Sequence, residues 1–476
     1  MMNPLLCATA LVLLIATATG FAQPAGTGKS APPKPNVIVI VADDLGWADV
    51  STYGLQRVPT PNIDAVAQRG VAFSSGYVAA PVCAVSRAGL MTGRYPQRAG
   101  FEYNFGEGGA DVGRGLPTTE RTIADHLHAA GYRTAVVGKW HQGETPGMYP
   151  TDRGFDEFYG YLGGTTTHVR PGTPGFVEAE PRGSTTREGA ARVITGPERK
   201  LVDNFDHYLT DDLTRQAIDF TGRSIAAKQP FFLYLAYSAP HRPFQAPQQW
   251  YDRFAHIADR NRRTYVAMIA AMDDAIGRLT AALKRSGTYD NTLIVFLSDN
   301  GCPAQFGVCD CSHPVNAGKF TQLEGGLRVP FVLSWPAGLA PQGINDRPVS
   351  SLDVLPTILK AAGMPAPPGL DGADLITTAT APRALERPLF WRQSPVLSMR
   401  EGKWKLWKSL DRKTTELYDL ERDAGETSDL AQRFPDVVQR LDKTLTQWSD
   451  TLAKPLWPNT MNYDMAVCGR TTQAIY

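Results

Sequence analysis

Short runs of apolar residues, each followed by polar residues, recur along the chain. Four of them cover residues 36–41, 134–137, 230–237 and 292–297. They are rich in β-branched or aromatic residues and do not alternate with polar ones, which is typical of strands buried on both faces. Helical patterns lie between them, at 122–130 and 263–286. Strands that alternate with helices predict an α/β fold, with a mostly parallel sheet flanked by helices.

Polar residues that can act in catalysis or metal binding follow each of these four runs. In chain order they are Asp43 and Asp44, Lys139 and His141, His241, and Asp299 with Asn300. Ligands of such sheets bind beyond the carboxyl ends of the strands, so we expect these side chains to gather at one edge. Three carboxylates and an amide oxygen suit Ca²⁺ or Mg²⁺. Taken alone, the Asp43-Asp44 pair also fits an exposed turn or a helix cap.

The composition changes near residues 365–380, and the pattern beyond them is different. Short apolar runs at 388–391, 396–400, 404–407 and 417–420 predict antiparallel strands, and 434–452 predicts an amphipathic helix. We therefore expect a catalytic domain over 36–375 and a smaller α+β subdomain over 376–476. Residues 165–200 are rich in Gly, Thr, Pro and Arg, and predict a long surface loop near the substrate.

The N-terminus reads as an export signal. Residues 5–19 are apolar and small, and a segment rich in Pro and Gly follows. We expect a signal peptide over 1–22, cleaved near Ala22, and a linker over 23–35, which places the protein in the periplasm or outside the cell. A disordered or anchoring N-terminus is the alternative, and the apolar run is too short for a stable membrane span. The net charge of +1 indicates no nucleic-acid partner.

The cysteines favour disulfides over a metal site. Of the six, Cys7 lies in the predicted signal and Cys83 is isolated, which leaves Cys302, Cys309, Cys311 and Cys468. An even number in an exported protein favours two disulfides, with three possible connectivities. We expect Cys468 to pair with Cys309 or Cys311 rather than Cys302, and so to tie the C-terminal tail to the rim of the site. A zinc site at Cys309-Asp310-Cys311 is the alternative, but no matching His/Cys spacing supports it.

The most informative segment is residues 81–94, PVCAVSRAGLMTGR. Cys83 stands four residues before Arg87, and this segment resembles the active-site signature of the type I sulfatases. In that family the cysteine is oxidised by a maturation enzyme to formylglycine. The usual core reads Cys-x-Pro-x-Arg, whereas Val85 stands at the Pro position here. The resemblance thus implies a conversion that is less efficient and depends on the host's maturation system.

The resemblance extends over most of the chain, from about residue 35 to about residue 430. The matching pieces are NVIVIVADDLG, TPNIDAVAQRGVAF, CAVSRAGLMTGR, GYRTAVVGKWHQG, RGFDEFYGY, APHRPFQAP, LIVFLSDNG, LEGGLRVPFVLSWPAG, GKWKL and ELYDLERD. It implies an alkaline-phosphatase-like core and one Ca²⁺. The implied metal ligands are Asp43, Asp44, the modified Cys83, Asp299 and Asn300.

The same resemblance implies roles for the catalytic residues Cys83, Arg87, Lys139, His141, His241 and Lys319. Arg87 and Lys139 would stabilise the formylglycine hydrate and the sulfate. His141 would assist the hydrate and the breakdown of the sulfated hemiacetal. His241 and Lys319 would hold the sulfate, and one of them would protonate the leaving oxygen.

These observations predict a sulfuric ester hydrolase. We expect a sulfated carbohydrate as its substrate, because of the export signal, the many Trp and Tyr residues and the long 165–200 segment. Two alternatives stay open from the sequence. One is a phosphonate or phosphodiester hydrolase that uses the same nucleophile, and the other is an unmodified, inactive homologue that binds sugar.

Overall fold

A computed structural model describes residues 34–55, 58–106, 111–179, 193–202, 207–313, 315, 317–382 and 387–476. The predicted signal peptide over 1–22, and all but the last residues of the 23–35 linker, lie outside this part. Within it, no helix combines the length and the apolar character that crossing a membrane requires. Residues 34–476 form one compact unit, and the division predicted at residue 375 stays a prediction.

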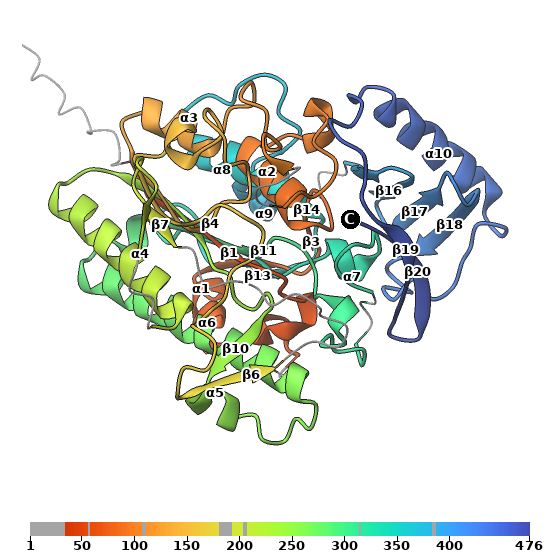
Figure 1. Cartoon of the computed structure of the whole chain (residues 1–476). Helices are drawn as coiled ribbons and strands as arrows, with labels where there is room; N and C mark the ends of the chain where they lie inside the picture. Colours follow the sequence, from red (N-terminus) through yellow and green to blue (C-terminus); the bar gives the residue numbers. More distant parts are fainter. Residues whose placement is uncertain are drawn as a thin grey trace, which may run out of the picture. The chain divides into compact units, whose positions relative to one another are not determined.

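The core is a ten-stranded sheet in the order β13-β2-β12-β11-β1-β9-β4-β5-β7-β8 (Figure 1). Its centre is parallel and consists of β11 (Thr292–Ser298), β1 (Asn36–Ala42), β9 (Phe231–Ala236), β4 (Arg133–Lys139) and β5 (Glu157–Tyr161). Antiparallel pairings join the outer strands β12 (Phe331–Ser334), β2 (Gly70–Phe73), β7 (Ile194–Thr195) and β8 (Lys200–Leu201), and β13 (Gly343–Asn345) runs parallel to β2. All four apolar runs are strands of the parallel centre, as predicted.

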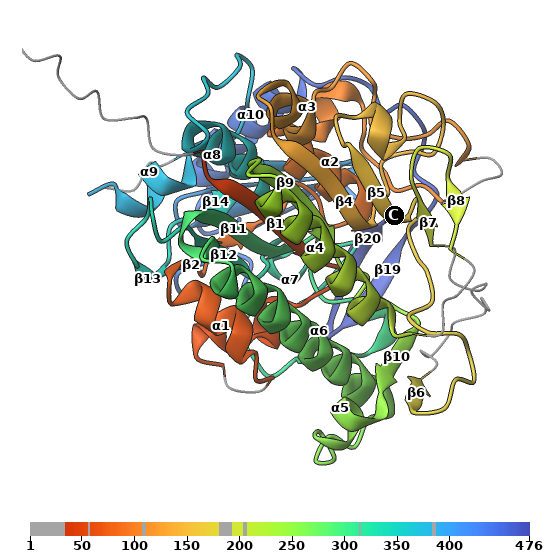
Figure 2. The same ribbon diagram turned by 90° about the vertical axis from the view of Figure 1, so that its left-hand side faces the viewer.

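The central strands bury both faces, which explains their continuous apolar runs. In β1, Ile38 and Ile40 join one core cluster, whereas Val37, Val39 and Val41 join the other. Helices cover each face, as Figure 2 shows. On the first face lie α1 (Pro61–Ala67), α4 (Leu209–Ala226) and α6 (Arg260–Arg285). On the second lie α2 (Cys83–Thr92), α3 (Ile123–Ala129), α8 (Val354–Ala361) and α9 (Leu375–Thr380).

Local chemistry fixes where these helices begin. Thr122 and Asp125 form a reciprocal capping box at the start of α3, and the Asp259 side chain accepts a hydrogen bond from the Arg262 amide at the start of α6. The smaller elements are α5 (Gln248–Asp252), α7 (Glu324–Leu327), β3 (Gly76–Tyr77), β14 (Val349–Ser350), β6 (Phe176–Ala179) and β10 (Phe244–Pro247). The segment expected as one long loop contributes β6, which pairs with β10, and β7, while 180–192 lies outside the described residues.

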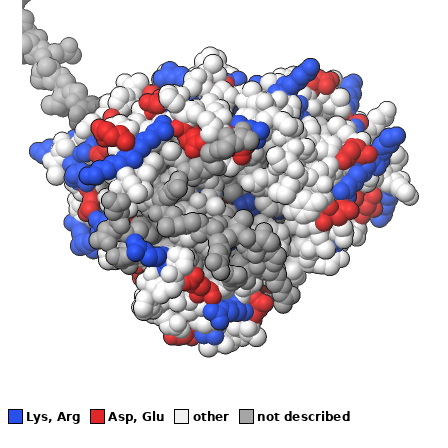
Figure 3. All heavy atoms as spheres, in the orientation of Figure 1, with Lys and Arg blue, Asp and Glu red and all other residues white. Residues whose placement is uncertain are grey.

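The C-terminal part has the predicted α+β character. The strands β15 (Leu389–Gln393), β16 (Val396–Glu401), β17 (Trp404–Ser409) and β18 (Thr414–Asp419) form an antiparallel sheet, against which α10 (Pro435–Ser449) packs. A final hairpin, β19 (Asn462–Val467) and β20 (Arg470–Ile475), was not predicted. On the face in Figure 3, cationic and anionic side chains are interspersed, in keeping with a net charge of +1.

Candidate active site

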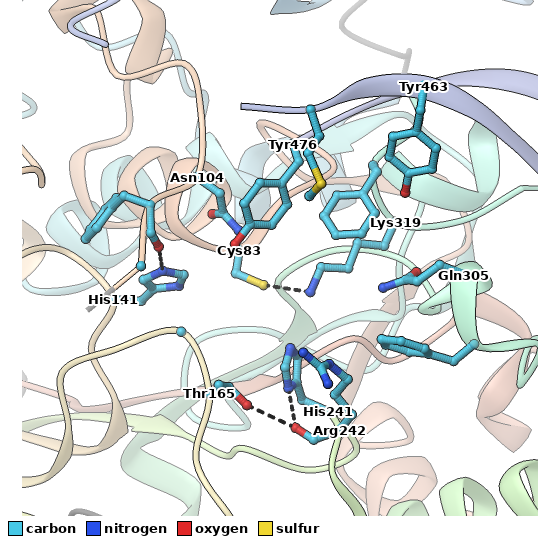
Figure 4. A pocket seen from close by; sticks show the side chains of 16 residues that line it. Cys83, Asn104, His141, Thr165, His241, Arg242, Gln305, Lys319, Tyr463 and Tyr476 are labelled. Atoms are coloured by element: carbon cyan, nitrogen blue, oxygen red, sulfur yellow. Dashed lines mark hydrogen bonds between the residues drawn. The ribbon is translucent and has the colours of Figure 1, made fainter. Parts of the chain in front are cut away.

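The structure brings the predicted site residues to one edge of the sheet. Asp43 and Asp44 directly follow β1, Asp299 and Asn300 follow β11, and Lys139 is the last residue of β4. Cys83 is the first residue of α2, which aims that helix at the same edge. A cavity of about 380 Å³ opens there, and Cys83, His141, His241 and Lys319 line it (Figure 4). We call the ten predicted residues the floor of this cavity. They are Asp43, Asp44, Cys83, Arg87, Lys139, His141, His241, Asp299, Asn300 and Lys319.

Cys83 lies buried among charged groups. Its Sγ accepts a hydrogen bond from Lys319 Nζ at 3.1 Å and lies 3.7 Å from Asp43 Oδ1 and 4.0 Å from Asp44 Oδ1. Burial raises the pKa of the Cys83 thiol to about 12, although Lys139 and Lys319 oppose the shift. The unmodified side chain is therefore a neutral thiol at physiological pH, and a poor nucleophile. Its Sγ marks the place of the oxygen that formylglycine would carry.

The buried charges of the floor are paired. Lys139 Nζ lies 2.7 Å from Asp43 Oδ2, Lys319 Nζ 2.7 Å from Asp44 Oδ1, and Arg87 donates to Asp299 Oδ2 at 2.8 Å. Burial raises the pKa of Asp299. It also acts to raise that of Asp44, but Lys319 and His241 outweigh it, so that the Asp44 pKa lies below its ordinary value. Removing one partner would leave a buried charge unpaired, which is strongly destabilising.

A cation would complete this arrangement. Asp43, Asp44, Cys83 and His241 each offer a ligand atom, and these atoms lie within 4.8 Å of one another. Asn300 Nδ2 donates to Asp44 Oδ1 at 2.7 Å, while its buried Oδ1 has no partner among the described residues. An amide oxygen without a hydrogen-bond partner, beside two carboxylates, suits a hard divalent cation.

Two of these placements differ in detail from the sequence prediction. His241 belongs to the compact ligand group, although the resemblance implied it for holding the sulfate or protonating the leaving oxygen. Asp299 accepts hydrogen bonds on both oxygens, from the Asp44 amide at 3.1 Å and from Arg87. Its part as a metal ligand stays a prediction.

The two histidines are held as neutral rings. His141 Nε2 donates to the Phe105 carbonyl at 2.9 Å, and its buried Nδ1 has no partner within the described ranges. His241 Nδ1 donates to the Arg242 carbonyl at 2.6 Å, and its Nε2 lies 3.6 Å from Asp44 Oδ2. Burial lowers the pKa of both well below the ordinary value. Gly164 makes room for His141, because a Cβ there would lie 2.9 Å from the imidazole Cε1.

The aromatic and apolar part of the cavity lining includes residues that the sequence did not single out. We call it the wall, and it comprises Phe306, Phe320, Met461, Tyr463 and Tyr476. Asn104, Thr165, Arg242 and Gln305 join the lining between floor and wall. No motif marks the five wall residues, although Cys468 was expected to tie the tail to the rim. Arg242 belongs to the matching piece APHRPFQAP, and Thr165 begins the 165–200 segment predicted near the substrate.

That tie is present. Cys311 bonds Cys468 across 157 residues, and Cys302 bonds Cys309 across 7. The prediction of two disulfides is confirmed, and of the two partners left open for Cys468 the structure selects Cys311. The shorter bridge encloses Gln305 and Phe306 of the cavity lining. Both bridges therefore stabilise segments of the site that do not belong to the sheet.

The fold and the site are those of an enzyme that hydrolyses anionic esters. Cationic side chains surround the position of its nucleophile. The Sulfatase family model matches residues 35–364, and the model for N-sulphoglucosamine sulphohydrolase, C-terminal, matches residues 318–451. The chain belongs to the sulfatase family and is a type I sulfatase.

Individual relatives support the same family assignment. N-acetylgalactosamine-6-sulfatase of Sus scrofa is 33% identical over 411 residues, which cover 83% of this chain and 74% of that protein. Arylsulfatase A of Homo sapiens is 33% identical over 481 residues, which cover 90% and 89%. The crystal structure of Ps i-CgsB in complex with k-i-k-neocarrahexaose superposes with a TM-score of 0.81 at 35% identity, covering 89% of this chain and 95% of that one. The predicted fold class, family and sulfuric ester hydrolase activity are confirmed.

Proposed function

We propose that this enzyme removes sulfate from a sulfated carbohydrate, using one Ca²⁺ and a formylglycine formed from Cys83. One observation carries the proposal. Cys83 lies at the start of α2 between two carboxylates and Lys319, where its thiol has a pKa of about 12. A cysteine at the centre of a charged site that cannot itself ionise suits conversion to another group.

The residues around Cys83 have separate tasks in this proposal. When present, formylglycine supplies a hydrated aldehyde as nucleophile, and Ca²⁺, held by Asp43, Asp44, Asn300 and Asp299, supplies positive charge. Arg87 and Lys139 add fixed charge that favours an anionic group, because their own carboxylate partners hold them in place.

The proton for the leaving oxygen has two candidate donors, and we assign it to Lys319. Burial acts to lower the pKa of Lys319, but Asp44 and its neighbours outweigh it and raise that pKa well above the ordinary value. Lys319 therefore carries its proton at neutral pH. His241 is neutral, and its Nδ1–H is directed at the Arg242 carbonyl. In this tautomer His241 Nε2 carries no proton, so His241 would hold a sulfate oxygen only in its protonated form. We assign the unpartnered Nδ1 of His141 to accepting a proton.

Maturation and export fit the same proposal. Cys83 is 2% exposed and Val85 is fully buried within α2, so a maturation enzyme would have to reach this segment before the chain folds. Disulfides persist in oxidising compartments, so the two bridges support a periplasmic or secreted location. The sugar preference draws on the relatives, of which one is named for N-acetylgalactosamine 6-sulfate and another binds k-i-k-neocarrahexaose.

Rates on matched esters test the proposal. Protein with confirmed formylglycine and bound Ca²⁺ should hydrolyse 4-nitrophenyl sulfate faster than bis(4-nitrophenyl) phosphate, and should release sulfate from a sulfated sugar. A preference for the phosphodiester would assign it instead to the phosphodiester hydrolases. Loss of all activity in protein with both groups present would contradict a sulfatase altogether.

A further inference from the structure

We infer that the terminal hairpin β19–β20 forms the subsite for the leaving group, with the Tyr463 ring as a platform for the sugar that carries the sulfate. This inference rests on the proposed function, since it assigns the part of the substrate beyond the sulfate. It makes Tyr463 a specificity-determining residue, outside the machinery that acts on sulfur.

The cavity is chemically divided. Cys83, His141, His241 and Lys319 line the cavity from the floor, and Tyr463 and Tyr476 stand across Lys319 and Cys83 from His241 (Figure 4). Phe306, Phe320 and Met461 complete the apolar lining. A sulfate held over Cys83 therefore leaves its ester group directed toward aromatic and apolar surface. Aromatic rings that keep a polar end suit ligands with both apolar faces and hydroxyl groups, which describes a sugar.

The two tyrosines of the wall differ in how they are held. The Tyr476 ring packs edge-on against Phe320, with ring centroids 5.3 Å apart, and its side chain lies beside Asn104 in the cavity lining (Figure 4). Asn104 Oδ1 in turn accepts from the Ala84 amide of α2 at 2.9 Å. The Tyr476 amide also donates to the Met461 carbonyl at 3.0 Å, so Tyr476 is held by its own contacts, and we assign it to shaping the subsite.

Tyr463 is placed for contact with a ligand. Its side chain lines the cavity and is half-buried, and Figure 4 draws no hydrogen bond between its hydroxyl and the other lining residues shown. It lies near enough to Lys319 for that charge to affect its pKa, which burial raises. The ring therefore stands close to the leaving-oxygen position.

The charge of the lining fits an anionic sugar. Its described residues include Lys319 and Arg242 but no Asp or Glu. Arg242 packs its guanidinium against the Phe306 ring at 5.2 Å, so a positive charge is fixed at the rim between floor and wall.

The hairpin is anchored at both ends. Cys468 at its turn is bonded to Cys311. Near the cavity, Asn462 and Gln473 donate to the Asp411 carboxylate at 2.9 and 3.1 Å, and the Ile475 amide donates to the Phe320 carbonyl at 3.0 Å. Because the strand that carries Tyr463 is fixed in this way, its ring is preorganised for binding.

Three variants and three substrates test the inference. The variants are Tyr463→Ala, Tyr463→Phe, and Thr471→Ala as a control at an exposed position on the same hairpin. The substrates are 4-nitrophenyl sulfate, N-acetylgalactosamine 6-sulfate and k-i-k-neocarrahexaose. Tyr463→Ala should lower kcat/KM at least tenfold for a sugar that the wild type hydrolyses, mainly through KM, and less than threefold for 4-nitrophenyl sulfate. Tyr463→Phe and Thr471→Ala should stay within threefold of wild type on every substrate.

Failure of the inference is separable from failure of the proposed function. If formylglycine-bearing wild type hydrolyses none of the three substrates, the proposed function is wrong. If it hydrolyses 4-nitrophenyl sulfate but neither sugar, the sugar subsite is wrong and the sulfatase activity stands. Equal losses on aryl and sugar sulfates in Tyr463→Ala, or no loss on either, would also overturn the subsite.

Discussion

The floor and the wall of the cavity are built by different physical means. Except for Lys319, which lies in the loop before α7, each floor residue follows a strand of the sheet or lies at its end or on α2. Buried ion pairs fix these side chains. The wall comes from loops and a terminal hairpin that hydrogen bonds and a disulfide hold against that edge. The contrast suggests separate roles for the two regions. The floor acts on the sulfate group whatever it is attached to, and the wall determines which attached groups can bind.

Removing the nucleophile position should have the largest effect. Cys83→Ala should lower kcat about 10³-fold or more on aryl and sugar sulfates alike, because no group replaces the nucleophile. Its thermal midpoint should stay near that of wild type, since Lys319, which donates to the thiol, keeps its ion pair with Asp44. Steady-state rates beside a melting curve measure both, and activity above one tenth of wild type would exclude Cys83 from the reaction.

Loss of the metal should also disable the floor. Asp44→Ala removes a carboxylate that contacts both Lys319 and Asn300, so we expect bound Ca²⁺ to fall to background and kcat to fall about 10²-fold. Elemental analysis with parallel rates measures this, and a chelator should reproduce it in the wild type. Full Ca²⁺ in the variant, or only zinc in the wild type, would refute the site.

Removing the long disulfide should affect the wall more than the floor. The Cys311→Ser/Cys468→Ser double variant opens a loop of 157 residues, which corresponds to at most about 5 kcal/mol of unfolding free energy in the chain-entropy view. The matched control, Cys302→Ser/Cys309→Ser, opens a loop of 7 residues and should lose about 2 kcal/mol.

The same pair of variants tests specificity. Loss of the long bridge should lower kcat/KM about tenfold for a sugar sulfate and less for 4-nitrophenyl sulfate, because it frees the hairpin and leaves the floor intact. Denaturant melts and rates on both substrates decide this. Equal losses on the two substrates would show that the hairpin braces the floor as well.

Low pH should slightly destabilise the β19–β20 hairpin, which carries part of the wall. Burial acts to raise the pKa of Asp411, but hydrogen bonds from Ser409, Asn462 and Gln473 outweigh it and hold that pKa at about 2. A carboxyl whose folded pKa lies below its unfolded value of about 3.9 stabilises at higher pH, and this contribution is lost as pH falls from about 4 toward 2. Hydrogen exchange of the 462–475 amides should therefore quicken over that range in wild type but not in Asp411→Asn. Identical pH profiles would mean that Asp411 does not dock the hairpin.

The floor was predictable from the sequence because its signals are local. Asp43-Asp44 and Asp299-Asn300 each follow a continuous apolar run, and parallel strands place such ends together. The wall was not predictable, since Tyr463 and Tyr476 are ordinary residues in a segment without a motif. Their position depends on long-range contacts, such as that of Ile475 with Phe320, which no periodicity encodes. Cys468 alone pointed there, and it could not distinguish Cys309 from Cys311.

The mass of the peptide that contains Cys83 tests the central claim most directly. Conversion of cysteine to formylglycine lowers that mass by about 18 Da. In active protein from a competent host we predict that a fraction of the peptide carries this shift, and that activity rises with the fraction. Val85→Pro should raise the fraction if Val85 limits the conversion. Active enzyme in which every Cys83 is an unmodified cysteine would contradict the account.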